Sequence, residues 1–390
     1  MPLQSSVHIV SRILLDLSEI EAMQAEWRAL EQDCADPLTY FQSYDWCRNW
    51  LVHHAEALNA RPVILTFWRD EVLLAIWPLM AVPDAGVSRL ETLGVPHAQY
   101  CGMLLRRGEK AESLRNVVRD AIRQSGCDVA LMRAVPSGSA LAKVLEDVPS
   151  VPGSENISSL LDLSIYDSAA DYTERLGKLQ KRNRNRRRNH LARLGELSFS
   201  VLWPDHPDYA DLVRQCAQMK RRWISETGRF SKGFSIPGYD GFLAGLPGDE
   251  AAKSGACLSV LRAGERVVAL EIGFIRQRHY YAYVGSFDWD LRHLSPGKVQ
   301  MDMTVGWLID NGIDTYDLMI DPADYKSSWS SSNLTVTSHA EALTWKGQVY
   351  AATWLLTVRP ALKRIRRRMP HLLQTAFAVL RGSALLLLYV

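Results

Sequence analysis

Four runs in the second half of the chain decide the fold: Leu261-Arg-Ala-Gly-Glu-Arg-Val-Val-Ala-Leu-Glu-Ile-Gly-Phe274, Tyr280-Tyr-Ala-Tyr-Val-Gly-Ser-Phe-Asp288, Leu294-Ser-Pro-Gly-Lys298, and Tyr316-Asp317 followed by Asp324-Tyr-Lys-Ser-Ser-Trp329. The first run has two apolar segments around Ala-Gly-Glu, which indicates two strands joined by a tight turn. The tyrosine-rich run predicts a third strand. Ser-Pro-Gly predicts the start of a helix, because Ser can cap a helix and Pro is tolerated at its first position.

Hydrophobic periodicity predicts the elements around these runs. In the second half we expect a basic helix at 169–195, strands at 197–203, 257–262, 267–276, 278–287, 315–320 and 334–344, and helices at 209–226 and from Ser295 to about Asn311. In the first half we expect helices at 17–33 and after Ser43, a hairpin of 61–68 with 72–80, a helix at 111–125 and a strand at 128–133. Mostly antiparallel strands with inserted helices are typical of an α+β fold.

The length of 390 residues favours two domains over one. We predict an α+β protein of two tandem domains with mostly antiparallel central sheets, followed by a basic, amphipathic helical tail. The predicted boundaries are 1–150 for the first domain, 151–165 for a Pro/Gly/Ser-rich linker, 166–355 for the second domain and 360–390 for the tail.

Composition narrows the class of protein. Hydrophobic residues make up 47% of the chain and charged residues 23%, which is typical of a folded globular protein. The six cysteines occur singly, without the Cys/His spacing of a zinc site, so we expect reduced thiols and no metal.

The two ends of the sequence bear on location. The N-terminus has no basic segment leading into an apolar core, so we expect no signal peptide and a cytoplasmic protein. The tail has a basic cluster before an apolar stretch, and its longest charge-free run, 382–390, is too short to span a bilayer. We expect this tail to attach reversibly to an anionic inner membrane face.

The order of the four opening runs resembles the second domain of the CelD/BcsL-type GNAT acetyltransferases, which are relatives of the FemAB peptidyltransferases. The run Phe41-Gln-Ser-Tyr-Asp-Trp46 and the basic helix also resemble this family, so the similarity spans roughly residues 10 to 350. The resemblance implies tandem GNAT folds, an acyl-CoA or aminoacyl-tRNA donor, and an amine or hydroxyl acceptor.

Two basic features are candidates for binding the phosphates of the donor. Ser295, Gly297 and Lys298 open a helix, where free backbone N–H groups and the helix dipole favour an anion. The basic helix carries eight Lys or Arg and no acid between 178 and 193, and from it we select Arg184 and Arg187. Its partner stays open among CoA phosphates, an acidic glycan, a lipid headgroup and a tRNA backbone. The chain lacks the Gly-rich pyrophosphate signature of ordinary GNAT enzymes.

The resemblance also implies roles at the reacting centre. Tyr325-Lys326 matches the Tyr/Phe-Lys that FemAB relatives place beside the donor carbonyl, so Lys326 is expected to polarise the carbonyl or neutralise an oxyanion. Asp288, after the tyrosine-rich strand, is our candidate for accepting the acceptor's proton, with Asp317 and Asp321 as competitors.

Acceptor binding is assigned to the third strand and its neighbour. Tyr281 and Tyr283 share one face of a strand and are expected to line the acceptor groove. Asp317 is expected to bind the acceptor as well. Core packing and turn capping are the alternatives for these side chains.

These observations favour an acyltransferase that moves an acetyl or other acyl group from acyl-CoA to an amine or hydroxyl. The expected acceptor is a glycan, amino sugar or lipid-linked intermediate of polysaccharide or envelope biosynthesis. One alternative is a FemAB-like transferase that uses aminoacyl-tRNA, and we expect no other nucleic acid as partner. The other is a non-catalytic binding module of a polysaccharide synthesis or export system.

Overall fold

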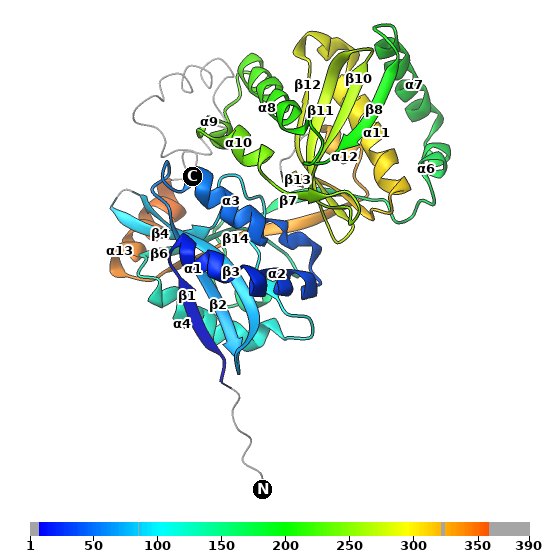
Figure 1. Cartoon of the computed structure of the whole chain (residues 1–390). Helices are drawn as coiled ribbons and strands as arrows, with labels where there is room; N and C mark the ends of the chain where they lie inside the picture. The colour runs from blue at the N-terminus through cyan, green and yellow to red at the C-terminus, as the bar shows by residue number, and fades with distance from the viewer. Residues whose placement is uncertain (1–7, 85, 321–323, 359–390) are drawn as a thin grey trace. The chain divides into compact units, whose positions relative to one another are not determined.

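The computed structural model describes residues 8–84, 86–320 and 324–358 (Figure 1). The chain divides into two compact units. Unit 1 contains the chain up to Asn156, the short piece Ser235–Pro237 and the described residues from Thr335 onward, whereas unit 2 contains Ile157–Phe234 and Gly238–Leu334. The chain therefore returns to unit 1 after unit 2 is complete.

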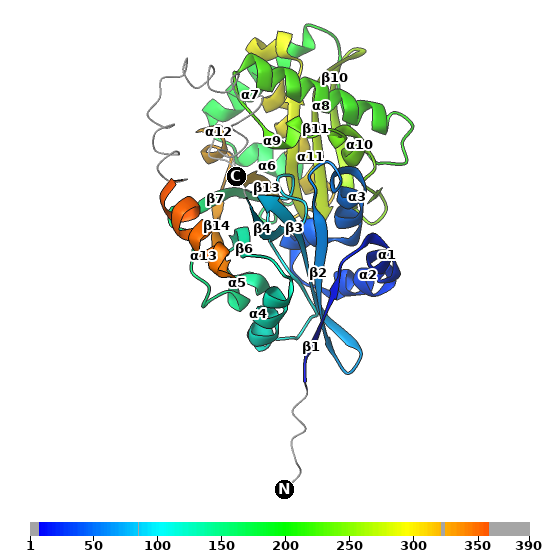
Figure 2. The same ribbon diagram turned by 90° about the vertical axis from the view of Figure 1, so that its left-hand side faces the viewer.

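Unit 1 is built on a sheet with the strand order β1-β2-β3-β4-β6-β14. Its elements are β1 (Val10–Leu14), α1 (Leu17–Ala22), α2 (Gln24–Asp33), η1 (Pro37–Gln42), α3 (Tyr44–His54), β2 (Arg61–Arg69), β3 (Val72–Asp84), β4 (Val87–Thr92), β5 (Leu104–Leu105), η2 (Ala111–Leu114), α4 (Arg115–Gln124), β6 (Val129–Pro136), α5 (Ala140–Val144), β14 (Ser332–Ala342), α13 (Trp345–Tyr350) and η4 (Ala351–Val358). The pairs are antiparallel except β4 with β6, which is parallel. Figure 2 shows α1 to α3 on one side of this sheet and α4 and α5 on the other.

Local sequence explains the first hairpin and its core. Asp70 and Glu71 join β2 to β3 with φ of 46° and 63°, which is the left-handed backbone that a two-residue hairpin turn requires. Val63, Leu65 and Phe67 alternate along β2 and enter one hydrophobic cluster with residues of α4 and α5. Because side chains of a strand point alternately to its two faces, these three residues lie on the face of β2 that packs against these helices.

Unit 2 repeats this plan with the strand order β8-β10-β11-β12-β13-β7. Its elements are β7 (Asn156–Asp162), α6 (Ala169–Arg175), α7 (Lys178–Ala192), β8 (Leu197–Leu202), α8 (Tyr209–Glu226), α9 (Lys232–Ser235), α10 (Tyr239–Ala244), β9 (Gly248–Asp249), β10 (Ser254–Ala263), β11 (Arg266–Arg276), β12 (His279–Phe287), η3 (Trp289–Leu294), α11 (Pro296–Asp310), β13 (Thr315–Ile320) and α12 (Asp324–Ser327). Again one pair within the unit, β12 with β13, is parallel.

Helices α8 and α11 cover opposite faces of this sheet. Ser286 of β12 donates to Cys216 Sγ of α8 at 3.2 Å. A Cβ added to Gly297 of α11 would lie 3.3 Å from the ring of Phe287. Because successive strand residues point to opposite faces, these contacts assign α8 to one face and α11 to the other (Figure 1).

The predicted α+β class with mostly antiparallel sheets in two tandem units is confirmed. The single basic helix expected at 169–195 is wrong: Leu176 and Gly177 are extended, so α6 ends at Arg175 and α7 begins at Lys178. The expected linker at 151–165 contains β7, which pairs with β13. The strand that we placed at the end of the second domain is β14, which pairs with β6 of unit 1.

Three further expectations concern the tail, membrane spans and metals. The tail at 360–390 lies outside the described residues. Within the described ranges no helix has the length and apolarity needed to cross a bilayer. In the same ranges no three His, Cys, Asp or Glu side chains gather as a metal site would require.

Candidate functional site

Strands β12 and β13 separate soon after they pair. Their parallel ladder consists of His279 with Thr315, Tyr280 with Tyr316, and Tyr281 with Asp317. The pairing of β11 with β12 also shifts by one residue between Ile272 and Gly273, which leaves Tyr283 as an extra residue on β12. Bulges of this kind redirect side chains and are over-represented next to active sites. The point where β12 and β13 part is therefore the natural place to look for a site.

A buried carboxylate lies at this point on the α11 face. Glu271 of β11 accepts from Tyr280 Oη at 3.0 Å and from Tyr316 Oη at 3.0 Å and 3.2 Å. The two tyrosine rings stack with centroids 5.4 Å apart. Burial raises the pKa of Glu271 to about 7, although the two hydroxyls, which favour the charged form, oppose that rise.

Glycine at 273 makes this arrangement possible. A Cβ at Gly273 would lie 2.1 Å from Tyr280 Cζ, so the ring of Tyr280 can cross β11 only over a glycine. Sequence reasoning did not select Glu271, although it lies in the first quoted run. The available signal was one acidic residue in the middle of an otherwise apolar strand.

A second carboxylate occupies the next position of β13. Asp317 is fully buried, accepts from Ser158 Oγ at 2.7 Å and from the Met319 N–H at 2.8 Å, and lies 3.1 Å from His279 Nε2. The ring of His279 packs against that of Tyr281 at 4.7 Å. Asp317 is thus part of a buried network, whereas we had expected it to contact the acceptor. His279 and Ser158 were not selected from the sequence because only the fold brings them to Asp317.

Lys326 lies close to this network. Its side chain is 7% exposed, and its ammonium group donates to the Met319 carbonyl at 3.0 Å. Met319 has φ of 63°, an unusual conformation for a large side chain that stores of order 1–3 kcal/mol of strain. Asp317 and Lys326 therefore hold the same strained residue, one at its N–H and the other at its carbonyl. The side chain of Tyr325, and Asp321 altogether, lie outside the described part of the chain.

The start of α11 differs from our expectation in one respect. Ser295 has φ of 58° and its hydroxyl makes no capping hydrogen bond, so the predicted serine cap is wrong. Pro296 occupies the first turn as predicted. Lys298 is exposed. Because Gly297 has no side chain, the start of the helix can approach the Phe287 ring of β12 closely. The helix start therefore lies against the part of β12 that has left β13.

Asp288 has two structural partners. One carboxylate oxygen accepts from the Asp290 N–H at 3.1 Å and caps η3, and the other binds the guanidinium of Arg266. Asp288 also lines a shallow groove of about 330 Å³ together with Gln215, Gln218 and Trp289. The turn-capping alternative therefore describes the contacts of Asp288.

The two arginines selected from the basic helix differ in their surroundings. Arg184 is 15% exposed, pairs with Asp302 of α11 at 2.6 Å, and lies over the ring of Tyr172. Arg187 is half-buried, and Arg182, Arg186 and others on the outer face of α7 are exposed. The guanidinium of Arg184 therefore ties α7 to α11, and the exposed positive charge comes from its neighbours.

The two tyrosines selected for the acceptor groove differ in exposure, since Tyr283 is half-buried. Tyr281 is fully buried. Tyr283 accepts from Tyr239 Oη of α10 at 2.9 Å and packs against the ring of Phe274, and burial raises its pKa above the usual range. Both tyrosines lie away from the α11 face, where Tyr280 contacts Glu271. The structure thus brings Lys326, Asp317 and Tyr281 together but not Asp288.

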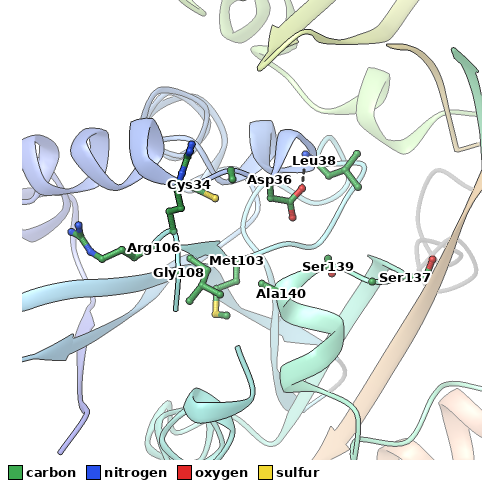
Figure 3. A pocket seen from close by; sticks show the side chains of 13 residues that line it. Cys34, Asp36, Leu38, Met103, Arg106, Gly108, Ser137, Ser139 and Ala140 are labelled. Carbon is green, nitrogen blue, oxygen red and sulfur yellow. Dashed lines mark hydrogen bonds between the residues drawn. The ribbon is translucent and has the colours of Figure 1, made fainter. Parts of the chain in front are cut away.

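A separate hollow of about 440 Å³ lies within unit 1 (Figure 3). Cys34, Met103 and Leu105 form part of its apolar wall. Its polar members already have local roles: Asp36 caps η1 and Ser139 caps α5. None of the residues selected from the sequence lines this hollow.

Comparison with known proteins bears on unit 2. Residues 178–327 match the model of the acetyltransferase (GNAT) domain family. This stretch of unit 2 resembles a GNAT domain. It begins with α7 and ends in α12, so it includes the separated strands, the start of α11 and Lys326. No curated protein matches the sequence.

Several solved structures share the fold of almost the whole chain. FemX has 9% sequence identity and a TM-score of 0.59, and the match covers 85% of this chain and 98% of FemX. The C-terminal domain of a putative lysylphosphatidylglycerol synthetase from Agrobacterium fabrum has 12% identity and a TM-score of 0.54, covering 86% and 95%. L-PGS from Bacillus licheniformis has 12% identity and a TM-score of 0.52, covering 85% and 96%. At sequence identities this low, the similarity shows a shared fold alone. The CelD/BcsL branch stays a prediction.

Proposed function

We propose that this protein is a GNAT-type acyltransferase that moves an acetyl or other acyl group from acyl-CoA to an amine or hydroxyl. One observation carries the proposal: β12 and β13 part within a matched GNAT domain, with the start of α11 on one strand and Lys326 at the end of the other. A thioester between the strands would have an anion site at one end and a cation near its carbonyl.

The donor's phosphates are assigned to the start of α11. Backbone N–H groups of the first turn and the helix dipole favour an anion there, and exposed Lys298 adds a positive charge. The exposed cations of α7, with half-buried Arg187, extend the positive field beside it. Arg184 contributes by fixing α7 to α11 through Asp302.

Lys326 is assigned to the reacting carbonyl. Its ammonium group is held in a buried place, where a charge acts on a developing oxyanion more strongly than it would in water. On donor binding it would exchange the Met319 carbonyl for the thioester oxygen. Tyr325 is retained beside it on the resemblance alone. Asp288 is already bound to Arg266 and η3, so we seek the proton acceptor elsewhere.

The resemblance implies a class of acceptor and not a single compound. We propose a glycan, amino sugar or lipid-linked intermediate of envelope or polysaccharide biosynthesis, used by a cytoplasmic enzyme. The similar structures named for lysylphosphatidylglycerol synthetase are compatible with a lipid-linked acceptor. Tyr281, Tyr283 and Asp317 shape the site from the face opposite α11 rather than from an open groove.

A second candidate donor is aminoacyl-tRNA. The observation that favours it is the outer face of α7, where Lys178, Arg182, Arg186 and Arg193 are exposed and no acid intervenes. A row of cations suits a polyphosphate backbone as well as it suits CoA.

Thermal-shift measurements separate these donors. A ligand at 100 times its dissociation constant stabilises the folded protein by about 2.7 kcal/mol. We expect acetyl-CoA and CoA to raise the unfolding temperature, and Lys298→Met to weaken that rise. A shift with charged tRNA only would favour the second candidate. No shift with any of the three would contradict both and favour a binding module.

A further inference from the structure

We propose that Glu271 is a catalytic residue of this site, and that its carboxylate accepts the proton of the attacking amine or hydroxyl during acyl transfer. The inference rests on the proposed function and adds a residue to it. It starts from three observations about the point where β12 and β13 part.

The first observation is position. Tyr280 and Tyr316 face each other across the parallel ladder, one residue pair before the strands separate. Their hydroxyls converge on Glu271, at 3.0 Å each. The carboxylate therefore marks the apex of the separation, on the same face as α11.

The second observation is access. Glu271 pairs across the sheet with Gly285, which lies on the part of β12 that has left β13 and is exposed. A Cβ built on Gly285 would lie 3.6 Å from Glu271 Oε2. No side chain of β12 therefore stands between this oxygen and the exposed surface of the strand. A reacting group between the strands can reach the carboxylate over Gly285.

The third observation is the set of groups around the carboxylate. Its hydrogen bonds come from the neutral hydroxyls of Tyr280 and Tyr316. The other titratable groups that act on it are Cys257 of β10 and, from α8, Cys216 and Lys220, whose ammonium group binds the Gly285 carbonyl. Burial outweighs these and holds the pKa of Glu271 at about 7. A carboxylate with that pKa can take up and return a proton near neutral pH.

The reaction balances with this single group. The acceptor nitrogen or oxygen attacks the thioester carbonyl carbon, and its proton goes to Glu271. The carbon–sulfur bond then breaks, CoA leaves as a thiolate, and the proton on Glu271 can pass to that thiolate. The products are the acylated acceptor and CoA, and Glu271 returns to its ionised form.

The test compares Glu271→Gln with the wild type, using acetyl-CoA and glucosamine and measuring the release of free thiol. We expect kcat to fall by about 10²–10⁴-fold, the contribution typical of a general base. The wild-type rate should fall below pH about 7, and the variant should lose this acid limb. Glu265→Gln, the same change at an exposed turn of the same hairpin, should keep both rate and profile.

Two further measurements keep the test decisive. Tyr316→Phe removes one donor to the charged carboxylate, so its acid limb should move to higher pH. Difference infrared spectra of the full chain should show a carboxyl band that titrates near pH 7, is absent in Glu271→Gln, and moves when acetyl-CoA binds.

The outcomes separate the two proposals. If the wild type binds no acyl-CoA, the proposed function fails and the role of Glu271 fails with it. Two results would overturn only the role of Glu271 in a wild type that binds acetyl-CoA. One is a Glu271→Gln variant that keeps the wild-type rate and acid limb, and the other is a carboxyl band that does not move when acetyl-CoA binds.

Discussion

The two units have sheets of similar topology, but these hold a buried carboxylate in opposite ways. In unit 1 the parallel ladder joins β4 to β6, and Glu91 of that ladder is 2% exposed. Arg89 pairs with it at 2.6 Å and Arg133 at 3.5 Å, while Arg89 also binds Asp84. In unit 2 the carboxylate beside the ladder is Glu271, and its hydrogen bonds come from neutral tyrosines.

The difference shows how similar sheets can place a buried carboxylate in a compensated ion cluster or among neutral hydroxyls. In unit 1 the hydroxyl of Tyr350 on α13 joins Arg89 and Asp84, so the ion cluster anchors the returning chain. The charges of Arg89, Asp84 and Glu91 compensate each other, so this cluster is structural. Without such compensation burial favours the protonated form, which leaves Glu271 able to change its protonation state near neutral pH. In our proposal unit 1 therefore supplies stability and unit 2 the chemistry.

The largest effect is expected in unit 1. Arg89→Ala leaves Asp84 and Glu91 buried without their main cation, and removal of one partner from a buried ion pair typically costs about 3–5 kcal/mol. Denaturant unfolding should show this loss. Arg12→Ala breaks an exposed pair with Glu71 and should cost less than about 1 kcal/mol. If both variants lose the same free energy of unfolding, the structural role that we assign to the cluster is contradicted.

The next effect belongs to Lys326. Lys326→Met keeps the length of the side chain and removes its charge, and loss of one group that stabilises an oxyanion typically lowers kcat by about 10²–10³-fold. The rate per folded molecule should fall accordingly, with a small change in the KM for acetyl-CoA. Lys298→Met should do the reverse, raising KM and keeping kcat. A variant at 326 with wild-type kcat would contradict the assignment.

The pH dependence of stability comes third. The pKa of Glu271 is raised from 4.5 to about 7 on folding, so the native state binds the proton more tightly than the unfolded chain. Stability from this group is complete below pH 4.5 and is lost as pH rises through 7, by about 3 kcal/mol in all. Unfolding titrations should show that Glu271→Gln lacks this decline. A decline of the same size in both proteins would show that another group causes it.

The smallest effect distinguishes two tyrosines. Tyr316→Phe should cost about 1 kcal/mol, the usual net worth of one hydrogen bond, and should change the slope of stability with pH because its hydroxyl binds Glu271. Tyr283→Phe loses a hydroxyl that binds Tyr239 and should cost a similar amount without changing the slope. If stability changes with pH by the same slope in both variants, the Tyr316 hydroxyl does not influence the titration of Glu271, and the assignment is contradicted.

Local patterns predicted much of the fold. The hairpin of β2 and β3 follows from two β-rich apolar runs on either side of Arg69-Asp70-Glu71, and the start of α11 follows from Pro296. Each of these signals lies within a few residues of the structure it determines. The break of the basic helix at Leu176 and Gly177 was missed although Gly177, just before the basic run, is a local helix-breaking signal.

Pairing over long distances could not be predicted from the sequence. Strand β7 follows Pro152 and Gly153, whose turn signals made the stretch resemble a linker, and its partner β13 lies more than a hundred residues away. The candidate site also combines residues with local sequence signals and residues that only the fold brings together. Lys326 was selected through a local motif, whereas Ser158, His279 and Asp317 meet only when three strands assemble. Glu271 offered one local signal, an acidic residue in an otherwise apolar strand, but its raised pKa depends on burial that only the fold creates.

The central claim is that one thioester donor lies between β12 and β13, and a crystal structure with bound CoA or a stable acyl-CoA analogue tests it most directly. The account predicts the diphosphate at Ser295–Lys298 and the acyl carbonyl within hydrogen-bond reach of Lys326, on the side of the strand that carries Gly285. A donor bound away from α11, with Lys326 still on the Met319 carbonyl, would contradict it.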